Sequence, residues 1–236
     1  DNARLIAEAG EILIPELDDI LRGFYARALT DPEASAFFEN DARVQSARNA
    51  QKKHWMRLLS GDFGAEYAAS VDRIGRTHAR INLPLDVYMS AYALSSGEML
   101  GLLAKGGRGG WFRRKRDTSH LVDVVSRVFA FDIELATTVT FAVWGEEQDR
   151  ALGHLNTAID ALAEGDLTQR IPSPDESDYP AAYDGVRQKI NAASENLGPI
   201  IARVAGSMDQ MLDTVARVNG SADDLSQRTN SQAASL

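Results

Sequence analysis

Cysteine is absent from the 236 residues of the chain. This absence excludes disulfides, thiolate nucleophiles and cysteine-ligated metal centres, and it fits a reducing compartment. Any metal must therefore be held by histidine or by carboxylates. The four histidines, His54, His78, His120 and His154, are scattered along the chain without the spacing of a zinc site. A multi-histidine zinc site is not predicted.

Basic residues are in the minority, with 25 Lys and Arg against 34 Asp and Glu and a net charge of −9. This balance argues against nucleic acid as a partner. The sequence also shows no long hydrophobic run and no secretory signal pattern, so we expect no membrane span and a cytoplasmic location. Because the chain begins at Asp1 and ends at Leu236 within a patterned segment, we expect it to be a piece of a longer protein.

Aromatic residues are unevenly distributed. Residues 1–150 hold 15 of the 17 aromatics, and residues 151–236 hold only Tyr179 and Tyr183. Large aromatic side chains fill globular cores, whereas thin helical bundles and coiled coils need few of them. The composition predicts a globular first part and an elongated second part.

Apolar periodicity in the first part is helical, and no alternating pattern typical of strands is sustained. Pro15, Pro32 and Pro84 stand where the apolar pattern changes phase, as expected at helix ends. The sequence predicts an all-α fold, with helices at 2–13, 15–29, 32–39, 42–60, 64–82, 85–104 and 118–164.

The second part begins with an amphipathic segment that Gly165 and a following stretch with several prolines should end. A second segment starts near Ala181, and we expect the Gly198-Pro199 pair to bend or interrupt it. Its apolar positions follow the 3/4 spacing of a coiled-coil seam, which favours a parallel homodimer because half a seam cannot bury itself. The seam positions are Ile190, Ala193, Leu197, Ile201, Val204, Met208, Met211, Val215, Val218, Ala222, Leu225, Thr229, Gln232 and Leu236.

Motifs of common enzymes are missing, so we expect no catalytic activity. The most informative position is His78, which has Ile74 four residues before it and Ile81 three residues after it. This spacing places the imidazole on the buried face of a helix, beside Tyr88 of the next helix. Such a histidine is either a core residue bonded to a carbonyl or a metal ligand.

The first part, over about residues 5–145, resembles the sensor globins, the family of globin-coupled gas sensors. The segments that carry the resemblance are Phe24-Tyr25, Pro32, Phe37-Phe38, His54-Trp55 with Leu59 and Gly61, Ile74-Gly75-Arg76-Thr77-His78-Ala79-Arg80-Ile81, Leu83-Pro84 and Tyr88-Met89.

The resemblance implies a globin-like domain that binds haem b and a diatomic gas such as dioxygen. His78 would then be the proximal ligand of the haem iron, and Tyr25 the distal hydrogen-bond donor to the gas. The other expected cofactor contacts are Phe24, Trp55, Tyr88, Ala50, Ile74 and Ile81. A phenol hydroxyl on the distal side favours a polar bound dioxygen over apolar gases.

Two positions depart from the family pattern. The distal segment 47–51 offers Ala47 and Ala50 at inward-looking spacing in place of a polar side chain, so we expect Tyr25 to act alone. Asn82 stands where the family commonly has glycine. His54 is expected at the pocket edge or on the surface.

The second part is similar to a HAMP module followed by the opening of a methyl-accepting chemotaxis receptor. The resemblance rests on residues 163–171, Ile190-Asn191, residues 222–229 and residues 232–236. It implies a sensor domain at 1–148, a HAMP domain at 149–198 and the start of a signalling coiled coil at 199–236. It also implies a chemotaxis histidine kinase and a coupling adaptor as partners.

These observations favour a cytoplasmic, dimeric, haem-based oxygen or gas sensor that signals in aerotaxis. Two alternatives stay open: a haem-free globin scaffold that senses another ligand or a partner, and a purely structural dimerisation module. A haem enzyme ranks last, because no proton-transfer residue is placed beside Tyr25.

Overall fold

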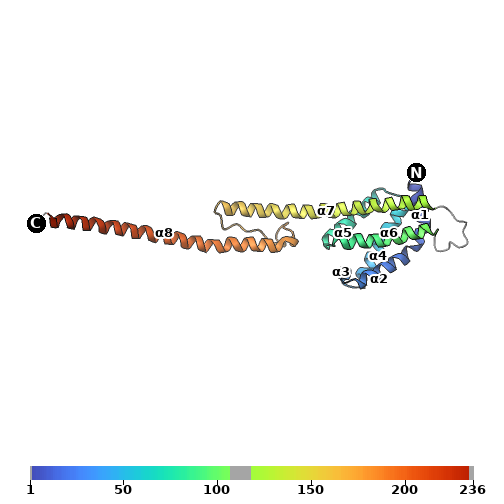
Figure 1. Cartoon of the computed structure of the whole chain (residues 1–236), viewed down its shortest axis with the longest axis horizontal. Coiled ribbons are helices and arrows are strands. Elements are labelled where there is room, and N and C mark those ends of the chain that lie inside the picture. Colours follow the sequence, from blue (N-terminus) through green and yellow to red (C-terminus); the bar gives the residue numbers. More distant parts are fainter. Residues whose placement is uncertain (1, 107–117, 234–236) are drawn as a thin grey trace. The chain divides into compact units, whose positions relative to one another are not determined.

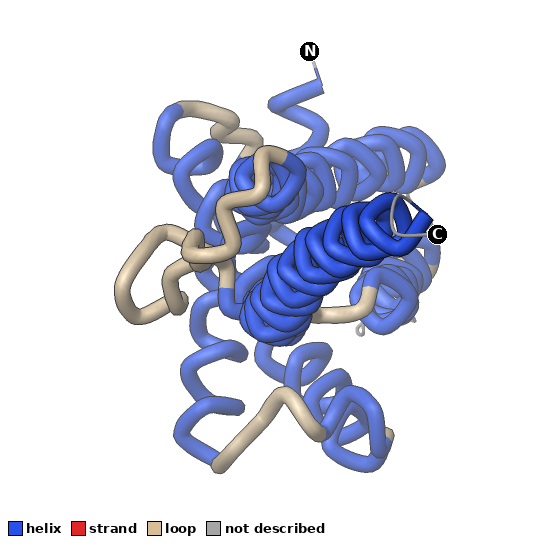
Figure 2. The backbone as a smooth tube through the Cα atoms, turned by 90° about the vertical axis from the view of Figure 1, so that its left-hand side faces the viewer, coloured by secondary structure: helices blue, strands red, loops and turns tan. Residues whose placement is uncertain are grey.

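The computed structural model describes residues 2–106 and 118–233, which form helices and contain no strand (Figure 2). The predicted all-α fold is confirmed. The helices are α1 Asn2–Leu13, the 3₁₀ helix η1 Ile14–Glu16, α2 Leu17–Thr30, α3 Pro32–Ser35, α4 Asp41–Ser60, α5 Ala65–Arg80, α6 Leu85–Ala104, α7 Ser119–Ala163, the 3₁₀ helix η2 Ala181–Tyr183 and α8 Asp184–Ala233.

Local capping chemistry sets the limits of the short helices around α3. The Asp31 side chain accepts hydrogen bonds from the backbone N–H groups of Glu33 and Ala34, at 2.9 and 3.0 Å, which starts α3 at Pro32. Asn40 is extended and caps α4 through the N–H of Arg43. The predicted helix 32–39 was therefore too long, because the chain leaves α3 after Ser35 to reach the extended Asn40.

The chain divides into two compact units, residues 1–145 and 146–236. In the first unit, α1, α2, α4, α5, α6 and the beginning of α7 are gathered into one bundle (Figure 1). Its core is formed by the buried faces of these helices. Fully buried side chains include Leu13, Leu17, Ile20, Leu21, Trp55, Leu58, Leu59, Met99, Leu103, Leu121 and Val125.

The second unit contains the end of α7, a connector and α8. Gly165 ends α7 in a left-handed conformation (φ 87°), and the N–H groups of Gly165 and Asp166 return to the carbonyls of Leu162 and Ala161. The predicted glycine stop is confirmed. Figure 1 shows the end of α7 and the start of α8 side by side and running in the same direction, with the connector returning between them.

The connector packs on α7 through a small core of Ala151, Ala158, Ile171 and Tyr179, and the partly buried Ile190 of α8 packs against this core. The Asn191 carboxamide of α8 also binds the backbone of Ile171 twice. It donates to the Ile171 carbonyl at 2.9 Å and accepts from the Ile171 N–H at 3.0 Å. This double hydrogen bond supplies the partners that an extended connector lacks.

Helix α8 continues through Gly198 and Pro199, so the interruption that we considered there does not occur. The predicted seam positions beyond this point lie on the surface of the single chain. The seam positions with a large exposed fraction are Leu197, which precedes Gly198, and then Ile201, Val204, Met208, Met211, Val215, Val218 and Leu225. Leu236, the last predicted seam position, lies outside the described residues.

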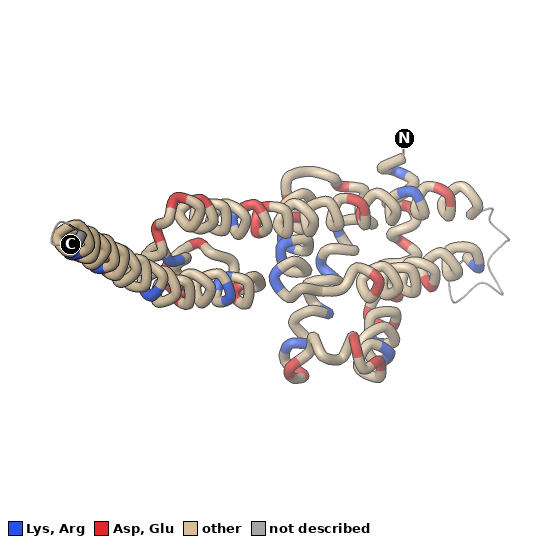
Figure 3. The backbone as a smooth tube through the Cα atoms, turned by 60° about the vertical axis from the view of Figure 1, so that its left-hand side comes forward, with Lys and Arg blue, Asp and Glu red and all other residues tan. Residues whose placement is uncertain are grey.

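One described helix, α7, is long and apolar enough to cross a membrane by length and composition alone. Length and composition do not test whether the helix spans a membrane, so the expectation of no membrane span stays a prediction. Only 22% of the most apolar 18-residue window of α7 is buried. Phe129 and Ala136 of this helix are buried in the core of the first unit, whereas Phe131 and Phe141 are exposed. Figure 3 shows acidic and basic residues interspersed along the described helices of both units.

Candidate functional site

His78 lies in the last turn of α5, and its ring is close to Tyr88 of α6, with 4.5 Å between the ring centroids. The side chain is half-buried. Its Nδ1 atom is fully buried and has no hydrogen-bond partner among the described residues. A core histidine bonded to a carbonyl through this nitrogen, one of the two sequence-based interpretations, is therefore not found within that part of the chain.

Burial lowers the pKa of His78 from 6.5 to about 4, so the imidazole is neutral at pH 7. A neutral imidazole is the form that binds a metal ion. Leaving a buried ring nitrogen without a partner costs free energy, since its hydration is lost and nothing replaces it. This cost and the neutral state together point to a ligand-binding role for His78.

The two isoleucines around His78 lie in different surroundings. Ile74 packs against the core of the first unit. Ile81 is 40% exposed, so the expectation that it buries the imidazole was wrong. Helix α5 ends at Arg80, and Ile81 no longer follows the helical phase on which the spacing argument depended.

The chain turns sharply after Ile81. Asn82 has a φ of 50° and is the only non-glycine residue with positive φ among the described residues. Glycine and asparagine tolerate this left-handed conformation better than other residues. This geometry explains why an asparagine is accepted where the sensor globins commonly have glycine.

Tyr25 of α2 is 7% exposed and donates a hydrogen bond to Oε1 of Gln51 on α4, at 3.0 Å. Edge-to-face contacts with Phe24 (4.9 Å) and Phe38 (5.7 Å) fix the ring. Burial raises the pKa of Tyr25 above its usual value, so the phenol remains a donor. The expectation that Tyr25 acts alone was wrong, because Gln51 is its polar partner.

The inward face of α4 explains why Gln51 was missed. Val44, Ala47 and Gln51 are half-buried, and Trp55 and Leu58 are fully buried, so these residues form one stripe. Ala50 falls outside this stripe and is exposed, so its role as a cofactor contact stays a prediction. The signal was present in the sequence, since Gln51 precedes Trp55 by four residues and therefore shares its helix face.

The remaining expected contacts gather around one core. Tyr25 and Trp55 belong to the buried core of the first unit, and Trp55 meets the ring of Tyr92 edge to face at 6.2 Å. The partly buried Phe24, Ile74 and Tyr88 pack against the same core. The structure thus brings together side chains from α2, α4, α5 and α6, as the resemblance requires.

A buried polar cluster, which we call the Asp132 cluster, joins four helices of the first unit. Asp132 of α7 is 2% exposed and accepts hydrogen bonds from Tyr67 Oη (2.6 Å) and Tyr92 Oη (2.8 Å). His54 Nε2 lies 2.9 Å from the same carboxylate, and its Nδ1 lies 3.0 Å from Ser70 Oγ. His54 is 3% exposed, so its expected place at the pocket edge or surface was wrong.

The Asp132 cluster is internally satisfied. Nε2 of His54 lies within hydrogen-bond distance of Asp132 and Nδ1 within that of Ser70, so each ring nitrogen has a partner. Burial, and next the charge of Asp132, raises the pKa of Tyr67 and Tyr92 and keeps both phenols protonated. The cluster lies near His78 through aromatic contacts, because Tyr88 meets both His78 and Tyr92.

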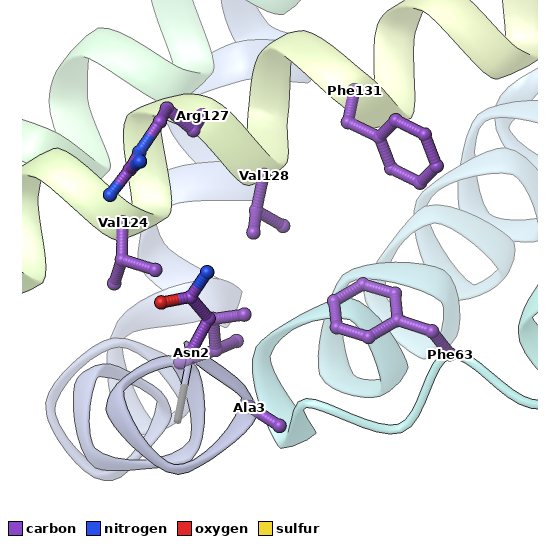
Figure 4. A pocket seen from close by; sticks show the side chains of 8 residues that line it. Asn2, Ala3, Phe63, Val124, Arg127, Val128 and Phe131 are labelled. Carbon is purple, nitrogen blue, oxygen red and sulfur yellow. The ribbon is translucent and has the colours of Figure 1, made fainter.

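An open apolar pocket with a cavity volume of ≈ 320 Å³ lies elsewhere in the first unit, between α1, α7 and Phe63 (Figure 4). Phe63 and Phe131 face each other across it, and Arg127, which pairs with Asp123, is its one charged side chain. None of the expected cofactor contacts lines this pocket. We therefore place the candidate site at His78 and Tyr25.

The model of the family described as Protoglobin matches residues 1–143. No curated protein matches the chain. Among solved structures, the chain is similar to the globin domain of E. coli DosC in a ferric form, with 18% sequence identity, a TM-score of 0.47, and coverage of 59% of this chain and 89% of that chain.

Proposed function

We propose that this protein is a haem-based gas sensor. The chain belongs to the Protoglobin family, and the proposal starts from this membership. Haem and diatomic gases are typical ligands of this family. The observation that carries the proposal is His78, a neutral imidazole with a buried nitrogen that has no partner among the described residues.

The residues present fit a haem group. His78 would bind the iron, and the apolar and aromatic side chains of Ile74 and Tyr88 would pack nearby. Bound haem would supply an iron atom with a further coordination position for a diatomic gas. Because the pKa of His78 is about 4, protons do not compete for the imidazole near neutral pH.

Tyr25 and Gln51 form the polar pair of the proposed distal side. Tyr25 stays protonated, and Oε1 of Gln51 accepts a hydrogen bond from its hydroxyl and orients it. To donate to a ligand the hydroxyl must turn away from Gln51, whereas the amide N–H₂ group of Gln51 is not engaged by Tyr25 and supplies a second donor. Donors of this kind favour a polar ligand such as dioxygen over an apolar gas.

We further propose that the second unit is a HAMP module that passes the ligand state to a chemotaxis signalling domain. Three observations support this proposal: the two helices running in the same direction, the buried connector residue Ile171, and the hydrogen bonds between Asn191 and the Ile171 backbone. The apolar seam of α8 supports a parallel homodimer with a second copy of the chain. In this proposal the protein is a cytoplasmic transducer without turnover of its own, and its partners are a chemotaxis histidine kinase and a coupling adaptor.

The test of haem binding is an absorption spectrum of the purified chain and of two histidine variants. We expect a Soret band in the wild type, its loss in His78→Ala, and its retention in His120→Ala, whose residue is exposed. A chain without a Soret band after supply of haem, or a His78→Ala variant with an unchanged band, would refute the assignment. A missing band would favour the haem-free sensor.

The distal pair has a separate test. Tyr25→Phe removes the donor and Gln51→Leu removes its partner, while both keep the side-chain volume near its original value. We expect dioxygen to dissociate about ten-fold faster or more from Tyr25→Phe, the factor expected for a lost hydrogen bond to a polar ligand. Unchanged dissociation, followed by stopped-flow absorbance, would remove Tyr25 from the site.

A further inference from the structure

Helix α5 lies directly on α7 at Gly75. A Cβ atom added at Gly75 would stand 2.5 and 2.6 Å from the side chain of Val139 and 2.8 Å from the carbonyl oxygen of Ala136. Each distance is far below an ordinary van der Waals contact, so only glycine fits. The backbone of α5 at Gly75 therefore packs directly against the side chain of Val139 and the backbone of Ala136 on α7.

Two hydrogen bonds fasten the same stretch of α5 to α7. Thr140 Oγ1 is 3.2 Å from the carbonyl oxygen of Gly75, and Trp144 Nε1 donates to the carbonyl oxygen of Ala79 at 3.3 Å. Thr140 Oγ1 also lies 2.9 Å from the Ala136 carbonyl, so two carbonyls share its proton. The two contacts are one helical turn apart on each helix, from 75 to 79 on α5 and from 140 to 144 on α7.

These contacts lie on both sides of His78 in the sequence. Gly75 lies three residues before His78 and Ala79 directly follows it, so the backbone turn that carries the imidazole is held at both ends. The contact at Gly75 resists approach of the helices, because nothing there can be compressed. The two hydrogen bonds resist separation of the helices. The turn therefore has little freedom to move relative to α7.

We propose that Thr140 and Trp144 are positioning residues that couple the His78 turn to α7, so that a displacement of this turn displaces α7. The inference rests on the proposed function, in which a gas acts at His78. It goes further by naming the two side chains that transmit the change. Both stand in the last turns of α7 before the boundary of the first unit at Gly145.

The test combines two conservative substitutions in the full chain as purified. Thr140→Val removes the hydroxyl and keeps the shape, and Trp144→Phe removes the indole N–H and keeps an aromatic ring near Phe141. Thr138→Val is the matched control, because Thr138 is an exposed threonine on the same helix. Hydrogen exchange of peptides covering 73–83 and 137–145 is followed by mass spectrometry, and the Soret band is recorded for each sample.

Without added gas, we expect amides in 73–83 of the double variant to exchange about two- to ten-fold faster than in the wild type, with no change in the control. In the reduced protein, we expect carbon monoxide to change exchange in 137–145 of the wild type and of the control. Most of this change should be absent from the double variant, although its Soret band remains.

Two results would overturn the proposal: unchanged exchange of 73–83 in the double variant, or a full carbon monoxide response of 137–145 in that variant. A purely structural role would speed exchange in 73–83 and leave the response to carbon monoxide intact, which also counts against the proposal. A missing Soret band in the wild type refutes the proposed function instead. The comparison without gas then still decides whether the two hydrogen bonds hold the His78 turn against α7, and unchanged exchange there overturns the proposal.

Discussion

Asp132→Asn is the most informative single substitution, because the carboxylate of Asp132 joins side chains from α4, α5 and α6 to α7. It is 2% exposed and receives three donors, Tyr67, Tyr92 and His54, at 2.6 to 2.9 Å. Asparagine has the same shape, so the substitution removes the charge and one acceptor oxygen without leaving a cavity. The change therefore isolates the electrostatic part of the cluster.

The magnitude follows from the donors that lose their acceptor. A hydrogen bond to a charged group contributes about 1.5–3 kcal/mol. The amide keeps one oxygen and presents an N–H₂ group toward donors, so at least one of the three donors remains unsatisfied. We expect the free energy of unfolding to fall by about 2–4 kcal/mol. Tyr92→Phe removes a single donor and should cost about 1–2 kcal/mol.

Urea unfolding followed by circular dichroism measures these losses as a lower midpoint with an unchanged slope. Asp123→Asn is the control on the same helix, since Asp123 forms an exposed i,i+4 pair with Arg127 and should change stability by less than about 0.5 kcal/mol. If Asp132→Asn were as mild as Asp123→Asn, the carboxylate would not be the acceptor of a buried network and the reasoning would be wrong.

Three further predictions concern α5 and its end. Asn82→Gly should leave the melting temperature unchanged or raise it, and Asn82→Val should destabilise by about 1–2 kcal/mol, because φ is 50° there. Gly75→Ala should destabilise the protein by about 2 kcal/mol or more, since the added Cβ meets Val139 at 2.5 Å. Gly97→Ala has nothing within 4 Å of the added Cβ and should stabilise α6 by about 0.5–1 kcal/mol. Calorimetry compares the two variants. In the haem-free chain, the lowered pKa of His78 means that the unfolded state binds more protons below pH 6.5. The free energy of unfolding is therefore unaffected by His78 titration above pH 6.5 and falls by up to about 3 kcal/mol as the pH approaches 4. Urea titrations at several pH values should show a smaller fall for His78→Leu.

Helix limits were predictable because their causes are local. Pro32 and Pro84 stop or start helices through their own backbone chemistry, and Gly165 ends α7 where the sequence predicted a break. Predicted and observed ends of α1, α6 and α7 differ by at most one residue. The burial of Tyr25 was also predictable, because the spacing of apolar residues within its own helix is enough to identify the buried face.

The errors arose where several helices meet. His54 is buried because Ser70 and Asp132, which are 16 and 78 residues away in the chain, supply its hydrogen bonds, and no local pattern encodes such partners. Ile81 was misplaced because the helix predicted at 64–82 ends at Arg80, two residues earlier. Gln51 was overlooked, although it lies four residues before Trp55 and therefore shares the buried face of that helix. The error arose because the inward face was assigned from Ala47 and Ala50 and not from Trp55.

The paired hydrogen bonds between Asn191 and the backbone of Ile171 restrict how α8 can travel. Sliding α8 lengthwise by a single residue shifts its side chains by about 1.5 Å, enough to break both bonds together. Rolling α8 about its own long axis by a few degrees stretches them far less. The connector therefore opposes translation of α8 along its axis and permits small rotations about that axis.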